Sequence, residues 1–153
     1  MNVERYEGDR KFLLPLFRRA DDSEMAIESY LHQGEVLIAR DQGMTIGHLQ
    51  IVEVDKQNVE LTSMAVVDAR HRSGIGRALV DAAVTRCMAR GAARIVVATA
   101  AASVGTLRFY QRVGFRMLRI ERDAFCAEAG YPPGIVIDGI PLRDRVWLDR
   151  ALR

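Results

Sequence analysis

The chain has 153 residues, of which 49% are apolar and 27% charged, which is enough to bury a substantial core in one domain. Its 22 lysines and arginines against 20 aspartates and glutamates leave a net charge of +2, too small to indicate nucleic acid as the main partner. No apolar run approaches the roughly 18 residues of a membrane helix, and the N-terminus lacks a signal-peptide pattern. We therefore expect a cytoplasmic protein that uses neither a membrane nor nucleic acid.

The N-terminal part predicts one edge strand followed by two helices. Residues 2–7 alternate weakly between polar and apolar, and residues 10–20 carry apolar side chains at helical spacing. Residues 21–24 (Asp-Asp-Ser-Glu) are typical of a helix start, and the helix that they begin runs to His32, with Gly34 as its stop signal.

The middle of the chain predicts an antiparallel meander. Its three strands cover residues 35–40, 44–54 and 59–67, and turn signals separate them at 41–43 and 56–58. The second half alternates helices and strands: a helix from Gly76 to Gly91, a buried strand at 93–99, a helix at 103–113, and strands at 115–122 and 145–149. Residues 123–141, with three prolines, are predicted as a long connection. We expect one mixed α/β domain over residues 1–153.

The segment 64–79 passes from a strand through a glycine-rich turn into a helix. Such a turn gathers unpaired backbone N–H groups at the positive end of a helix dipole, where phosphate binds, and Arg72 and Arg77 add positive charge. A Gly-x-Gly turn alone is also compatible with a plain strand-to-helix connection. A dinucleotide-binding fold is disfavoured because Leu79 stands where a third small residue belongs, and a P-loop is disfavoured because no Gly-Lys-Ser/Thr is present.

This turn resembles the acetyl-CoA signature of the GNAT N-acetyltransferase superfamily, Gln/Arg-x-x-Gly-x-Gly/Ala. Residues 71–76 read His-Arg-Ser-Gly-Ile-Gly, so His71 replaces the usual Gln or Arg. The resemblance implies that the preceding strand lies along the pantetheine arm and that the turn holds the pyrophosphate. The implied cofactor-binding residues are Met64, Ala65, Val66, His71, Arg72, Ser73, Gly74, Ile75, Gly76 and Arg77.

A second segment is similar to a later helix of the same family, Asn-x-x-Ala-x-x-Phe/Leu-Tyr-x-x-x-Gly-Phe. It begins at Ser103, ends at Phe115, and has Ser103 and Thr106 where the family carries Asn and Ala. The resemblance assigns Ser103, Thr106 and Tyr110 to the cofactor site, and Tyr110 as the acid that protonates the departing thiolate. A tyrosine that merely packs the helix on the sheet is the alternative. Ser103 is also expected to cap the helix.

Glu60 is a candidate general base. It lies eleven positions before His71, where the histone-acetylating branch of the family carries a glutamate, and an amine must lose a proton before it attacks a thioester. Strand alternation predicts that Glu60, Thr62 and Met64 share one face. A solvated charge, with ordered water acting as the base, is equally compatible with the sequence.

The remaining reactive side chains are weaker candidates. Cys87 and Cys126 have no metal-ligand spacing, and Cys87 is expected to pack in the core. His48 alternates within a strand as a surface or core residue. An acidic group around the long connection, suited to a cationic acceptor or simply solvated, comprises Glu121, Asp123, Glu128 and Asp138.

The resemblance implies a GNAT-like fold: a mixed, mostly antiparallel sheet of about six or seven strands, splayed at the cofactor slot and flanked by about four helices. It implies direct transfer of the acetyl group of acetyl-CoA to a primary amine, without a metal. A CoA-binding regulatory or sensor module without transfer activity is the alternative, because three motif positions depart from the family pattern. Residues 12–32 and 123–141 are expected to wall the acceptor site. A polyamine, an aminoglycoside, an amino acid and a protein amine remain open as acceptors. For residues 123–141, a lid and a subunit contact in a homodimer both remain open.

Overall fold

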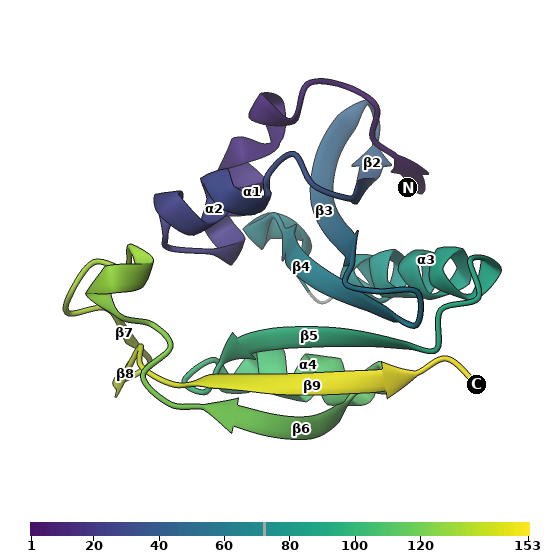
Figure 1. Cartoon of the computed structure of the whole chain (residues 1–153). Helices are drawn as coiled ribbons and strands as arrows, with labels where there is room; N and C mark the ends of the chain where they lie inside the picture. Colours follow the sequence, from purple (N-terminus) through teal and green to yellow (C-terminus); the bar gives the residue numbers. More distant parts are fainter. Residues whose placement is uncertain (72) are drawn as a thin grey trace.

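The computed structural model describes residues 1–71 and 73–153 and arranges them around one seven-stranded sheet (Figure 1). In spatial order the strands are β1 (Asn2–Arg5), β2 (Glu35–Asp41), β3 (Met44–Glu53), β4 (Asn58–Val66), β5 (Arg94–Ala100), β9 (Arg145–Ala151) and β6 (Arg116–Glu121). All neighbouring pairs are antiparallel except β4 and β5. The mixed, mostly antiparallel sheet predicted from the sequence is confirmed.

Four α-helices accompany the sheet: α1 (Leu14–Ala20), α2 (Glu24–Tyr30), α3 (Ile75–Ala89) and α4 (Val104–Arg112). The helix predicted over 10–20 is divided into a 3₁₀ turn, η1 (Arg10–Leu13), and α1, because Pro15 lacks an N–H and occupies the first turn of α1. Ser23 caps α2 as predicted, since its Oγ accepts a 3.0 Å hydrogen bond from the Ala26 N–H. None of the helices in the described ranges has the length and apolarity needed to cross a bilayer.

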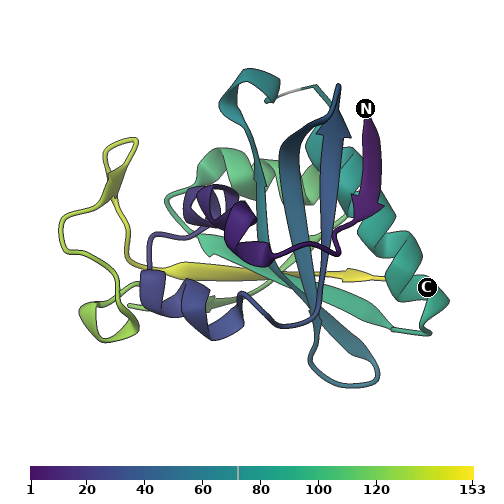
Figure 2. The same ribbon diagram turned by 90° about the horizontal axis from the view of Figure 1, so that it is seen from above.

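Helices lie on both faces of the sheet (Figures 1 and 2), and an apolar layer is buried on each face. The larger one joins α3 and α4 to β2–β5 and β9, and Leu79, Val80 and Cys87 of α3 are fully buried in it. The smaller one packs α1 and α2 on the opposite face, around Phe17 and Ile27. Cys87 is therefore a packing residue, as predicted.

The connection before β9 is more ordered than the sequence analysis predicted. It contains a 3₁₀ turn, η3 (Ala127–Ala129), and a small hairpin of β7 (Val136–Ile137) and β8 (Ile140–Pro141). Asp138 and Gly139 form the hairpin turn with φ of 48° and 83°, the positive values that a two-residue Asp-Gly turn adopts. The Asp-Gly signal was present in the sequence, but residues 123–141 were predicted only as a long connection, without this hairpin.

Candidate active site

The central strands β4 and β5 pair over only part of their length. Parallel pairing joins Asn58–Leu61 to Arg94–Val97, and beyond these residues the two strands diverge. A cavity of about 460 Å³ occupies the divergence, lined by residues 60–64 of β4 and 97–100 of β5. In Figure 1 the separation widens towards the side where α1, α2 and the β7–β8 hairpin lie. Splaying of the sheet near Val66 was predicted, and it opens the cavity.

The predicted pyrophosphate turn leaves β4 through a 3₁₀ turn, η2 (Asp68–Arg70), and enters α3. Gly74 is the N-cap of α3 with φ of 84°, a conformation that glycine adopts at little cost. Gly76 is needed for a different reason, because a Cβ at this position would lie 3.1 Å from ring carbons of Phe109 on α4. Arg72, one of the predicted cofactor residues, lies outside the described residues.

Side chains of the turn are directed to the protein's own backbone. His71 Nε2 is 2.7 Å from the Val66 carbonyl oxygen, the Ser73 hydroxyl donates to the Arg70 carbonyl, and Arg77 donates to the Arg112 carbonyl at 3.3 Å. Ile75 is buried in the core. Within the described part of the turn, the groups available to a ligand are therefore mainly backbone, including the first N–H groups of α3.

Tyr110 lies on α4 and lines the cavity together with Ser103 and Thr106. Its ring packs against those of Phe109 and Phe115, with centroids 5.3 and 5.4 Å away. Burial raises the pKa of the Tyr110 hydroxyl above its ordinary value, so the phenol keeps its proton throughout the physiological range. A protonated phenol facing a cavity is suited to donate a proton or a hydrogen bond.

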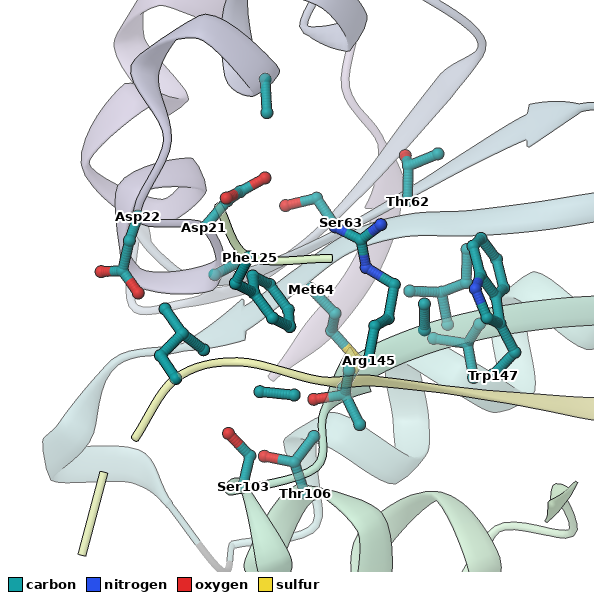
Figure 3. Close-up of a pocket in the computed structure, with 18 of the residues that line it drawn as sticks. Asp21, Asp22, Thr62, Ser63, Met64, Ser103, Thr106, Phe125, Arg145 and Trp147 are labelled. Carbon is teal, nitrogen blue, oxygen red and sulfur yellow. The ribbon is translucent and has the colours of Figure 1, made fainter. Parts of the chain in front are cut away.

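The predicted cap by Ser103 is wrong. Ser103 is the N-cap residue of α4, but its hydroxyl makes no capping hydrogen bond. The residue lines the cavity instead, beside Thr106 (Figure 3). Its backbone carbonyl accepts the first helical hydrogen bond, from the Leu107 N–H at 3.0 Å.

Glu60 enters the same cavity from β4. Its carboxylate is partly buried, and this burial raises the pKa of Glu60, while the positive charge of Arg145 lowers it. A carboxylate with a raised pKa is a better proton acceptor than an ordinary surface glutamate.

The predicted face shared by Glu60, Thr62 and Met64 is wrong. Gln50 of β3 pairs with Ser63, whereas the next residue of β3, Ile51, pairs with Leu61, so Thr62 is an extra residue that forms a bulge in β4. The bulge reverses the alternation beyond it. Met64 consequently packs in the layer of α3, while Glu60 lies close enough to Tyr30 of α2 to affect its pKa.

The wall opposite the cofactor turn is formed by the segment between α1 and α2 and by the connection before β9. Asp21 is held by two phenols: Tyr30 donates to its Oδ2 at 2.8 Å and Tyr131 to its Oδ1 at 2.7 Å. Phe125 and Trp147 complete the aromatic lining, and Arg145 reaches in from β9 (Figure 3). Residues 12–32 and 123–141 were predicted to contribute this wall, and both do.

Sequence comparison identifies the family to which these features belong. The sequence model of the Acetyltransferase (GNAT) family matches residues 6–115. The chain belongs to the GNAT acetyltransferase family. The resemblance recognised in the two motifs, and the fold that it implied, are thereby confirmed.

The relatives of this GNAT chain extend over almost its whole length. An uncharacterized N-acetyltransferase of Bacillus subtilis, YvbK, is 30% identical over 151 residues, which cover 97% of this chain and 96% of the relative. A GNAT family acetyltransferase from Elizabethkingia anophelis with acetyl-CoA bound has a TM-score of 0.90 at 26% identity, covering 98% of this chain and 97% of its own. An acetyltransferase of Bacillus subtilis in complex with CoA has a TM-score of 0.89 at 30% identity, covering 99% and 98%.

The cavity of this GNAT chain is lined by residues that the sequence analysis did not identify. Asp21 and Tyr131 are 110 positions apart in the sequence, and no local pattern connects them. Conversely, the acidic group around the connection does not line the cavity: Glu121 bonds to Trp147 and Arg145, and Asp123 to Arg143. The carboxylates that line the cavity are those of Asp21, Asp22 and Glu60.

His48 lies behind the cavity wall of the GNAT site. It is fully buried, its Nε2 is 2.8 Å from the Ser63 hydroxyl, and Nδ1 has no hydrogen-bond partner among the described residues. Burial lowers the pKa of His48 to about 3, so the ring is neutral. Because an unpaired buried N–H costs more than an unpaired lone pair, we assign the proton to Nε2. Ser63, which lines the cavity, then keeps its own hydroxyl hydrogen for another partner.

Proposed function

We propose that the whole chain, residues 1–153, is an acetyl-CoA-dependent N-acetyltransferase that transfers the acetyl group to a primary amine by direct attack in a ternary complex. The observation that carries the proposal is the single cavity at the splayed strands, which Tyr110 enters from α4 and Glu60 from β4. A proton donor and a proton acceptor thus face the same space from different elements. Two relatives whose fold matches nearly the whole chain were crystallised with acetyl-CoA or CoA bound.

The cofactor end of the site is formed mainly by backbone. We assign the pyrophosphate to the turn from His71 to Arg77 and the first N–H groups of α3, and the pantetheine arm to the open edge of β4 at Met64, Ala65 and Val66. Backbone N–H groups of this edge polarise the thioester carbonyl. Ser103 and Thr106 line the space beside the thioester.

The proposed acetyl transfer involves the following proton transfers. The acceptor ammonium loses one proton to Glu60, directly or through an ordered water, and the free amine attacks the thioester carbonyl carbon. The carbon–sulfur bond breaks, Tyr110 protonates the departing sulfur, and the amide nitrogen loses its second proton, which restores the phenol. The cavity contributes by holding both reactants in one place.

Substituting Tyr110→Phe tests the assignment of the acid. The variant should lower kcat by about 100-fold or more, because general acid catalysis contributes on that scale, while the Kd for acetyl-CoA changes little. The matched control is Tyr6→Phe, whose hydroxyl bonds to the Asp9 carbonyl outside the cavity. An unchanged kcat in Tyr110→Phe would show that Tyr110 only packs the helix.

A CoA-binding sensor without transfer activity is the second candidate, motivated by the unusual residues His71, Ser103 and Thr106. A broad screen of amines with detection of released thiol separates the two. The sensor would bind acetyl-CoA and release no CoA with any acceptor. The cytoplasmic location and a possible homodimer remain predictions, and sedimentation of the purified protein tests the latter.

A further inference from the structure

The acceptor half of the cavity contains two opposite charges that do not pair with one another. Glu60 enters from β4 and Arg145 from β9, on the two sides of the divergence. Arg145 lowers the pKa of Glu60, so its charge is felt at the carboxylate, yet among the described residues no ion pair joins the two. Both charges line the same cavity of about 460 Å³, so a ligand in this cavity would be exposed to both.

Arg145 is anchored by Glu121 and Phe125 and lies close enough to the Tyr131 hydroxyl to oppose the burial that raises the pKa of that group, yet these contacts use only part of its N–H donors. Its Nη1 donates to Glu121 Oε1 at 3.4 Å, and the same oxygen accepts a shorter bond of 3.0 Å from the Trp147 indole. Its guanidinium stacks 4.8 Å over the Phe125 ring, and its side chain is 25% exposed. By comparison, Arg94 on β5 bonds to Asn58 at 2.6 Å and to Asp149 at 2.9 Å. Arginine has five N–H donors in a planar fork, which suits a carboxylate.

The other charged residues that line the cavity are already bound or solvated. Asp21 accepts hydrogen bonds from Tyr30 and Tyr131 and from the Ser23 N–H. Arg19 pairs with Asp68 at 2.8 Å, and Asp22 is exposed. Among the half-buried charges of the lining, Glu60 and Arg145 are therefore the two that a bound acceptor would meet, together with the exposed carboxylate of Asp22.

We infer, on the basis of the proposed function, that the acceptor is a free amino acid: its ammonium faces Glu60 and its carboxylate is bound by Arg145. A polyamine or aminoglycoside would bring additional positive charge towards Arg145, which like-charge repulsion disfavours. A simple monoamine would leave Arg145 with its long contact to Glu121. The aromatic rings of Tyr30, Phe125 and Trp147 fit an apolar or aromatic amino-acid side chain. Arg145 is thus a specificity-determining residue.

The test compares free amino acids with amides that differ only in the carboxylate. L-phenylalanine and L-leucine are each paired with the corresponding C-terminal amide, and CoA release is measured with acetyl-CoA. For the preferred amino acid, kcat/KM should exceed that of its amide by at least about tenfold, the scale of a hydrogen bond to a charged group. Arg145→Gln should lower this ratio to about one by raising the KM of the amino acid. Arg145→Lys should retain part of the preference.

The matched control is Arg116→Gln, which should leave the ratio unchanged. Arg116 is exposed and begins β6, whereas Glu121, which pairs with Arg145, ends that strand. Thermal unfolding of each variant verifies that it is folded. A ratio of one in the wild type, preference for the amides, or a ratio that survives Arg145→Gln would overturn the inference. In each of these cases, CoA release with other amines would leave the proposed function standing.

Failure of the proposed function can be distinguished from failure of this inference. If acetyl-CoA binds and no acceptor is acetylated, calorimetry of the CoA-saturated protein with L-phenylalanine and L-phenylalaninamide decides the inference independently of turnover. Tighter binding of the acid that depends on Arg145 supports it. Equal binding or no binding of the two overturns it.

Discussion

Glu60 is a carboxylate that burial destabilises and that the proposed reaction requires. Burial raises its pKa, so between its ordinary value near pH 4 and the raised value the folded protein binds more protons than the unfolded chain. Stability therefore falls as the pH rises through this window. The cost remains at neutral pH, where the carboxylate is charged.

Substituting Glu60→Gln should separate these two effects. At pH 7 the variant should have a Tm higher by on the order of one or two degrees, since the buried charge is gone, and a kcat lower by about 100-fold. Below about pH 4 the difference in Tm should vanish, because the wild-type carboxyl is then neutral. Calorimetry at both pH values and steady-state kinetics measure this. Glu53→Gln, at an exposed position of β3, is the control. An unchanged kcat would assign the base to ordered water.

At the scale of elements, α3 and α4 meet where Gly76 faces Phe109, the residue before Tyr110. A Cβ at Gly76 would lie 3.1 Å from the Phe109 ring, so Gly76→Ala should displace this ring by a few tenths of an ångström. We expect this strain to outweigh the gain in helix propensity, so that the free energy of unfolding falls by about 1 kcal/mol and acetyl-CoA binding weakens several-fold. Chemical denaturation and calorimetry measure the two effects.

The control lies within α4 itself. A Cβ at Gly105 would meet open space, so Gly105→Ala should raise the free energy of unfolding by about 0.5–1 kcal/mol through helix propensity. If both substitutions changed stability in the same direction, the steric explanation for Gly76 would be wrong.

Local patterns in the sequence predicted most elements, and the misses arise from non-local contacts. The meander, α3 and the turn at Gly74 follow from apolar periodicity and glycine positions. The bulge at Thr62, by contrast, depends on pairing with β3, and without it the alternation placed Met64 on the wrong face. The hydrogen bond between Tyr131 and Asp21 depends on how the connection before β9 packs against the segment between α1 and α2. Of the cavity lining, the sequence therefore predicted Glu60, Met64, Ser103, Thr106 and Tyr110 by residue, and the wall opposite α4 only as two bounding segments.

At the scale of the whole molecule, the two halves of the sheet are joined by a short parallel ladder between β4 and β5. Residues of β4 beyond Leu61 have N–H groups directed away from β3 without a strand partner on that side. A ligand bound along this edge would join the two halves.

Acetyl-CoA should accordingly stabilise the fold as a whole. At about 100 times its Kd, binding to the native state alone adds about 2.7 kcal/mol to the free energy of unfolding. Hydrogen exchange should slow at the N–H groups of residues 62–66 that point away from β3, while amides already paired between β2 and β3 slow only through the global effect. A rise in Tm without local protection would place the ligand elsewhere.

The division of the proposed site between backbone and side chains has a consequence for how such a protein changes its substrate. The proposed pyrophosphate contacts are mainly N–H groups and glycine geometry, which do not depend on neighbouring side chains such as that of His71. The proposed acceptor contacts are the side chains of Asp21, Glu60, Tyr131 and Arg145, carried on four separate segments that line the cavity. Under this proposal, a few substitutions among these four side chains would change the acceptor while the acetyl donor stays the same.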